Sequence, residues 1–286
     1  MDDSEEPEGG SETAGERFSS FTKRNILLVA VFFLSNLLTA VSTLFTAVTA
    51  WEETRTDWRA AEYRKLRGLR AGYTLEKFQR ELGPPVFRTP LAPDSAFVRN
   101  VYRPREQYWV EAISNKSNAA VTYAVTTCDP TFRPEFVFVG GDDRQNMVVL
   151  NQSTLSEVLP AQEQRGEGLK IFVGGTGGSY SLVFHSYGRG GGTRYREFAW
   201  GLNDVCLAWR GKTSGRDLEI AWGRWYREHL SGEAPPGHVF VPTRLDEEAR
   251  DLMAESVVNT YAETASNEQM LTYYPTQIGV DRLTVQ

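Results

Sequence analysis

A run of 25 uncharged residues near the start of the chain, Ile26 to Ala50, limits what the protein can be more than any other feature. It contains neither Pro nor Gly, and as a helix it rises about 37 Å, enough to cross a hydrocarbon layer of about 30 Å. A core helix should show a polar stripe at the helical period, whereas the only hydrophilic residues here are uncharged Ser, Thr and Asn. The run therefore predicts a transmembrane helix over residues 25–51, with membrane lipid as its partner.

A removable export signal is the alternative, because Lys23-Arg24 precede the run and small residues, Val48-Thr49-Ala50, end it. A signal core usually has only about 7 to 15 apolar residues, so we expect the helix to be retained. The charges beside the run, Lys23-Arg24 before it and Glu52-Glu53 after it, place the soluble body outside the cell. Counted over about twenty residues, the Lys and Arg favour a cytoplasmic body instead. We expect a single-pass cell-membrane protein with its body outside, and the orientation stays open.

The first 24 residues are acidic and poor in large apolar side chains. The formal net charge of the chain is −6, and most of the acidic excess lies in this segment. Such a segment cannot recover the entropy lost on ordering, so residues 1–24 are expected to form a disordered acidic tail. The rest of the chain is close to neutral and has no concentrated basic run, which argues against nucleic acid as a partner.

Helical and alternating patterns follow the apolar run. Residues 52–68 have mixed charges without Gly or Pro before Gly68, and predict a helical stalk. LEKFQREL, between Thr74 and the stop Gly83, predicts a short helix. The alternating segments VRNVY, QYWVEAIS and AVTYAVTT then predict antiparallel strands. Residues 69–143 are therefore expected to form a small α+β unit.

Residues 144–286 are expected to form a second α+β unit. Short runs of Val, Phe, Tyr and Trp punctuated by glycine predict further strands, and Leu218 to Leu230 predicts a helix. Leu245 to Tyr261 has apolar residues on one helical face and carboxylates on the other, which predicts an amphipathic helix. The predicted fold class is α+β: a transmembrane helix and stalk followed by antiparallel sheets with short covering helices.

The block AGYTLEKFQRELGPPVF followed by QYWVEAISNKSNAAVTYAVTT, within residues 69–128, resembles the small domain of SmpA/OmlA (BamE-like) envelope proteins. That resemblance implies a short capped helix and a strand meander. The soluble part as a whole looks like an uncharacterised family of bacterial single-pass membrane proteins, which offers no catalytic residues to transfer. The lipobox cysteine of envelope lipoproteins is missing, so the resemblance does not extend to lipid attachment.

The chain contains two cysteines, Cys128 and Cys206. They are candidates for one disulfide, which would persist if the body lies outside the cell, and two free buried thiols are the alternative. Two cysteines without a CxxC pattern, and the distant His185, His229 and His238, predict neither a metal site nor a cofactor.

Four tryptophans cluster in the second half of the chain: Trp200, Trp209, Trp222 and Trp225. They are candidates for an interaction surface, and core filling is the alternative. We expect the soluble part to serve in interaction or scaffolding with a protein partner that the sequence does not identify. The alternatives are an enzyme with scattered site residues around Arg189, Arg194 and Arg196, and a ligand sensor that signals through the stalk.

Overall fold

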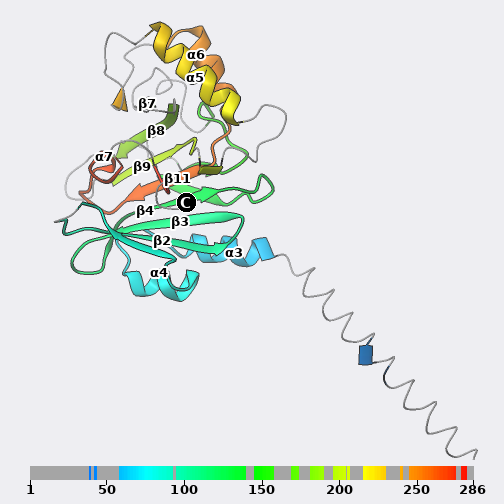
Figure 1. Ribbon diagram of the computed structural model, residues 1–286, viewed down its shortest axis with the longest axis vertical. Coiled ribbons are helices and arrows are strands. Elements are labelled where there is room, and N and C mark those ends of the chain that lie inside the picture. The colour runs from blue at the N-terminus through cyan, green and yellow to red at the C-terminus, as the bar shows by residue number, and fades with distance from the viewer. Residues whose placement is uncertain are drawn as a thin grey trace, which may run out of the picture. The chain divides into compact units, whose positions relative to one another are not determined.

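The computed structural model divides the chain into two units, Met1–Trp58 and Arg59–Gln286, and the second carries the sheet (Figure 1). The structure describes the following residues: Thr39, Ser42, Thr43, 58–92, 95–139, 145–157, 169–173, 181–189, 196–203, 205–206, 215–229, 239–240, 245–274 and 278–281.

A nine-stranded antiparallel sheet forms the centre of the second unit. Its strand order is β1-β2-β3-β4-β11-β9-β8-β7-β10, so the meander β2–β4 and the meander β7–β9 meet on either side of β11. The strands are, in this order, Phe87–Pro90, Val98–Arg105, Tyr108–Ser114, Ala120–Thr127, Thr260–Thr264, Arg196–Gly201, Ser181–Arg189, Leu169–Val173 and Val239–Phe240.

One face of the sheet is rich in aromatic side chains. It is covered by α3 (Trp58–Arg67), by α4 (Leu75–Leu82) and by the hairpin of β5 (Glu135–Val139) and β6 (Gln145–Val149). Phe78 of α4 lies against Tyr102 and Tyr123, and Phe136 of β5 stacks on Tyr261 at 4.3 Å between ring centroids. These rings bury large apolar areas and hold the helices and the hairpin on the sheet.

The opposite face carries smaller side chains and is covered by α7 (Met270–Tyr273) and by residues 278–281. Ile113, Ala124 and Ala262 form its floor, and Tyr274 and Ile278 pack onto them. Small residues in the strands leave room for the irregular C-terminal segment to approach the sheet.

Two further helices, α5 (Gly215–His229) and α6 (Glu247–Glu255), pack against each other (Figure 1). The Trp222 indole N–H donates to Ser256 Oγ at 2.9 Å, and the Trp225 indole N–H donates to both carboxylate oxygens of Asp246. Asp246 also caps α6, because its carboxylate accepts from the Ala249 amide. The same side chain therefore begins one helix and holds the other.

The transmembrane part of the predicted fold class is wrong for the part of the chain that the structure describes. No helix there is long and apolar enough to cross a membrane. The longest, α5, has 15 residues and carries charges along its length, whereas a span needs about 20 mainly apolar residues. Of the predicted span 25–51, only Thr39, Ser42 and Thr43 are described, and the predicted tail 1–24 lies outside the described residues.

The predicted α+β content agrees with the structure, but one nine-stranded sheet runs through both predicted units, and only the β5–β6 hairpin forms a separate sheet. The helix over residues 75–82 is confirmed, and so is a helix across most of residues 218–230. Of the predicted stalk 52–68, the part from Trp58 is α3, which packs on the sheet through Leu66. The boundary predicted between residues 143 and 144 falls in a segment outside the described residues.

The predicted helix from Leu245 to Tyr261 is wrong in its second half. Helix α6 ends at Glu255, and Thr260 and Tyr261 begin β11. The amide and the hydroxyl of Ser256 both bond the Leu252 carbonyl and end the helix. Pairing with β4 on one side and β9 on the other then outweighs the helical pattern of the sequence.

Candidate functional site

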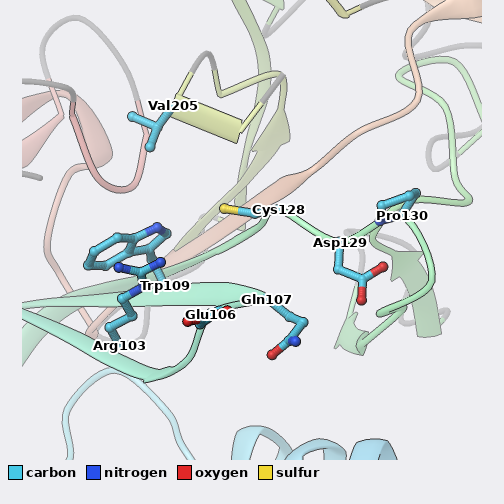
Figure 2. Close-up of a pocket in the computed structure, with 8 residues that line it drawn as sticks. All are labelled: Arg103, Glu106, Gln107, Trp109, Cys128, Asp129, Pro130 and Val205. Carbon is cyan, nitrogen blue, oxygen red and sulfur yellow. The ribbon is translucent and has the colours of Figure 1, made fainter. Parts of the chain in front are cut away.

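The candidate site is a pocket of about 550 Å³ beside the β2–β3 hairpin, which we call the Trp109 pocket (Figure 2). The hairpin tip is tied to the segment after β4, because the Cys128 amide donates to the Gln107 carbonyl at 2.7 Å. The pocket is lined by Arg103, Glu106, Gln107, Trp109, Cys128, Asp129, Pro130 and Val205.

A β-bulge in β2 places Arg103 at this pocket. The register pairs Tyr102 with Val110 and then Arg105 with Tyr108, so Arg103 and Pro104 together lie opposite Trp109. Pro104 lacks an amide hydrogen and fits at such an irregularity. The extra residue in β2 therefore brings the Arg103 side chain to the pocket.

The indole of Trp109 forms one wall of the pocket and is only 7% exposed. It packs with Val101, Cys206 and Val280. The guanidinium carbon of Arg103 lies over the Trp109 ring system, 4.7 Å from its centroid, which is a cation–π contact (Figure 2).

The two candidate cysteines, Cys128 and Cys206, are joined by a disulfide with a Cα–Cα distance of 4.6 Å. The bond links the segment after β4 to the segment after β9, and it keeps Val205 at the pocket. Closing a loop across 78 residues stabilises a folded chain by about 4 kcal/mol in the chain-entropy account. The pocket wall is therefore covalently fixed.

The charged side chains at the pocket differ in how many hydrogen bonds they already make within the protein. Asp129 Oδ1 accepts from the amide and the hydroxyl of Thr131, both at 2.8 Å. Arg103, by contrast, has no hydrogen bond or ion pair among the described residues beyond its contact with the Trp109 ring. Its guanidinium donors remain available to a ligand.

A buried charge cluster lies next to the pocket on the same face of the sheet. Arg99 Nε is 3.4 Å from Glu111 Oε2, and Arg99 also bonds Asp281 at 2.5 Å. Burial raises the pKa of the Glu111 carboxyl to about 7, and the Arg99 charge opposes this rise. The side-chain amide of Asn203 donates to the Ile278 and Val280 carbonyls at 2.8 Å each. These bonds hold the C-terminal segment beside Trp109.

Two more buried carboxylates lie on the opposite face and are occupied structurally. Glu263 accepts from the Ala71 amide at 2.7 Å and lies 3.9 Å from Arg70, and burial raises its pKa. Burial also acts to raise the pKa of Glu62, but hydrogen bonds from Lys65 and Tyr108 outweigh it and lower the pKa. Both groups hold α3 and the turn after it on the sheet.

One group of side chains in the described part of the chain has the spacing of metal ligands: Glu228, His229 and Glu248, all exposed. His229 Nε2 lies 3.2 Å from Asp246 Oδ2, and Nδ1 lies 3.0 Å from the Trp225 carbonyl. Both ring nitrogens therefore already face acceptors within the protein. The geometry explains how α5 and α6 are joined, and we assign no metal to it.

The tryptophans proposed as an interaction surface lie in the core where the structure describes them. The side chains of Trp200, Trp222 and Trp225 are almost wholly buried. Trp200 stacks on Phe138 of the β5–β6 hairpin. Their size serves packing, and Trp209 lies outside the described residues.

The arginines considered for a scattered active site do not form one described cluster. Arg194 lies outside the described residues. Arg189 ends β8 and pairs in register with Arg196 of β9. Arg196 donates to the Ala71 carbonyl at 3.5 Å, a contact that supports the turn after α3.

Of the residues that line the Trp109 pocket, only Cys128 was a sequence candidate, as one half of a possible disulfide. Pro104 inside a strand-like run, VYRPREQYW, was the available signal, because proline in a strand indicates an edge or a bulge. Comparison of the chain with protein-family models, with curated proteins and with solved structures finds no match. The resemblance of residues 69–128 to BamE-like domains thus stays a prediction.

Proposed function

We propose that this protein is an interaction module that holds one chemical group of a protein partner in the Trp109 pocket. The observation that carries the proposal is the guanidinium of Arg103, which lies over the Trp109 ring and has no hydrogen-bond acceptor among the residues that the structure describes. Trp and Arg are among the residue types that are enriched where binding energy is concentrated at protein interfaces. Here Arg103 and Trp109 contact each other inside the pocket before any partner binds.

The size and the lining of the pocket support the same proposal. Binding pockets usually measure about 300 to 1,000 Å³ and combine apolar walls with a few polar groups. This pocket, of about 550 Å³, offers the Trp109 ring and Val205 as apolar wall and three charged side chains. A chemical group that enters the pocket therefore contacts both apolar surface and charged side chains.

The disulfide indicates the kind of compartment in which the protein acts. Disulfides persist in oxidising compartments and are rare where thiols are kept reduced. The Cys128–Cys206 bond forms part of the pocket wall itself. We therefore propose that the module acts in an oxidising compartment.

A pocket-blocking substitution tests the proposal. A random dodecapeptide library displayed on phage is selected against the full chain, and the enriched peptides are titrated against two variants. Gln107→Trp fills the pocket from the hairpin tip, and Gln79→Trp makes the same change on the exposed surface of α4. We expect Gln107→Trp to weaken binding at least about tenfold and Gln79→Trp to leave it unchanged.

Two results would contradict the proposal. One is a set of enriched peptides that bind Gln107→Trp as tightly as the unchanged chain. The other is a selection that yields no peptide binding above the background of unselected phage.

A further inference from the structure

We infer that the Trp109 pocket selects the carboxylate of an acidic side chain in an extended peptide, and that Arg103 binds it. The inference rests on the proposed function and names the chemistry of the group that the pocket holds. It depends on how the charges around the pocket are already used.

Arg103 is arranged to bind a planar anion. Its guanidinium is held against the Trp109 ring at 4.7 Å, and its N–H donors have no protein acceptor among the described residues. A guanidinium presents donors in a fork that matches the two oxygens of a carboxylate. Because stacking already restricts the side chain, less conformational entropy is lost when the ligand binds.

The acidic residues of the pocket do not cancel this preference. Asp129 uses Oδ1 to accept two hydrogen bonds from Thr131, which disperse its charge. Glu106 lies exposed at the tip of the hairpin, where water screens it. Neither of them lies within ion-pair distance of Arg103.

Further arginines attach to the segment that forms the pocket wall. Arg59 donates to the Thr131 hydroxyl at 2.6 Å, and Arg133 donates to the Pro130 carbonyl at 3.4 Å. Their charges raise the electrostatic potential beside Asp129 and Pro130. A negatively charged group approaching the pocket is therefore attracted before it reaches Arg103.

The two carboxylates set an upper limit on the charge of the ligand. A carboxylate carries one negative charge, whereas a phosphorylated side chain carries about 1.5 to 2 at neutral pH. Repulsion from Glu106 and Asp129 therefore costs a phosphate more than it costs a carboxylate. The same two side chains can accept hydrogen bonds from the amides of an extended peptide.

The test uses four acetylated, amidated tripeptides that differ only in the central residue: glutamate, glutamine, lysine or phosphoserine. The full chain is labelled with 5-fluorotryptophan, and the fluorine resonance of Trp109 is assigned by its loss in Trp109→Phe. We expect the glutamate peptide to shift this resonance and to bind at least about tenfold more tightly than the other three.

Variants separate the guanidinium fork from charge alone. Arg103 is exposed, so its substitution should leave the fold intact, and thermal melting of each variant checks this. Arg103→Lys keeps the charge and should lose at least about fivefold in affinity for the glutamate peptide, because the fork is gone. Arg80→Lys, at an arginine of α4 whose side chain is 70% exposed, is the matched control and should bind as before.

The outcomes distinguish this inference from the proposed function. Equal binding of the glutamate and glutamine peptides, or tighter binding of the lysine or phosphoserine peptide, overturns the carboxylate inference and leaves the pocket as a binding site. Unchanged affinity in Arg103→Lys also overturns it. If none of the four peptides moves the Trp109 resonance at millimolar concentration while library peptides still bind through the pocket, only the carboxylate inference fails. If those also fail, the proposed function fails with it.

Discussion

Glu111 lies 3.4 Å from the Nε of Arg99 and is completely buried, yet among the described residues neither of its carboxylate oxygens has a hydrogen-bond partner that meets ordinary geometry. The ion pair lies between adjacent strands, under the C-terminal segment that Asp281 ties to the same arginine. Burial in this position favours the protonated, neutral form of the carboxyl group over the charged form.

The first prediction concerns the pH dependence of stability. Burial raises the pKa of Glu111 from its ordinary value of 4.5 to about 7. The folded chain keeps this proton where the unfolded chain has released it, so the associated stability is present below pH 4.5 and is lost as the pH rises through about 7. The loss amounts to about 3 kcal/mol, from the linkage of 1.36 kcal/mol per pKa unit.

Urea unfolding at a series of pH values measures this effect. Glu111→Gln cannot ionise, so its free energy of unfolding should fall less between pH 4.5 and 8 than that of the unchanged chain, by about 3 kcal/mol. Glu76→Gln, at an exposed position of α4, should follow the unchanged chain. The same pH profile in Glu111→Gln and the unchanged chain would show that another group is responsible.

A second prediction concerns the disulfide. Reduction should lower the free energy of unfolding by about 4 kcal/mol, because the long loop between Cys128 and Cys206 is no longer closed in the unfolded chain. The measurement is urea unfolding with and without a dithiol reductant. The chain has no other cysteine, so the double variant Cys128→Ser, Cys206→Ser should be insensitive to the reductant. A reductant effect that persists in the double variant would exclude the bond as its source.

A third prediction compares two glycines that both have a positive φ. Gly83 and Gly279 have φ of 84° and 79°. A Cβ at Gly279 would lie 2.5 Å from Thr126 Oγ1 and 3.0 Å from Thr260 Oγ1, whereas a Cβ at Gly83 meets no atom within 4 Å. Gly83 has φ 84° and ψ −174°, a backbone region that is essentially limited to glycine, so Gly83→Ala should cost about 1 to 3 kcal/mol. The close contacts at Gly279 should make Gly279→Ala cost at least about 1 kcal/mol more. Equal losses in urea unfolding would argue against close packing of the C-terminal segment on the sheet.

A fourth prediction concerns the link between α5 and α6. Asp246→Ala removes the cap of α6 and the acceptor of the Trp225 indole, and should destabilise the chain by about 1 to 2 kcal/mol. Asp246→Asn keeps an oxygen for the cap and should lose about half as much or less. Chemical denaturation of both variants checks the order. If the alanine variant is as stable as the asparagine variant, the capping bond contributes nothing measurable.

Local chemistry made part of this fold predictable. Thr74 and Gly83 bracket α4, and the alternating residues around Tyr108 and Tyr123 mark β3 and β4. Each of these signals lies within about ten residues of the element that it defines, so no long-range contact is needed to recognise it. The antiparallel meander next to α4 follows from them.

The central strand could not be predicted in this way. Thr260 and Tyr261 continue the apolar face of the helix that precedes them, so the pattern itself favours a helix. Their strand conformation comes from pairing with Thr126 and Val125 on one side and with Gly201 and Trp200 on the other. These partners lie far away in the sequence, where no local pattern reports them.

The candidate site escaped sequence analysis for a related reason. Arg103 and Trp109 are close in sequence, but the pocket also needs Cys128, Asp129 and Val205, which only the folded sheet brings together. The tryptophan cluster attracted attention by its composition and proved to lie in the core where it is described. Composition shows how many aromatic rings the chain contains, but it does not show which ring is buried in the core and which one borders a pocket.

The position of β11 between β4 and β9 has a consequence for how the chain is made. Strands β4 and β9 are synthesised before β11, which lies between them in the sheet. During translation each meander therefore has one unpaired edge. The sheet becomes continuous only after β11 has emerged. Nascent chains halted before Thr260 should therefore be the species most prone to aggregate or to recruit chaperones, and completion of the sheet is a late step in the life of each molecule.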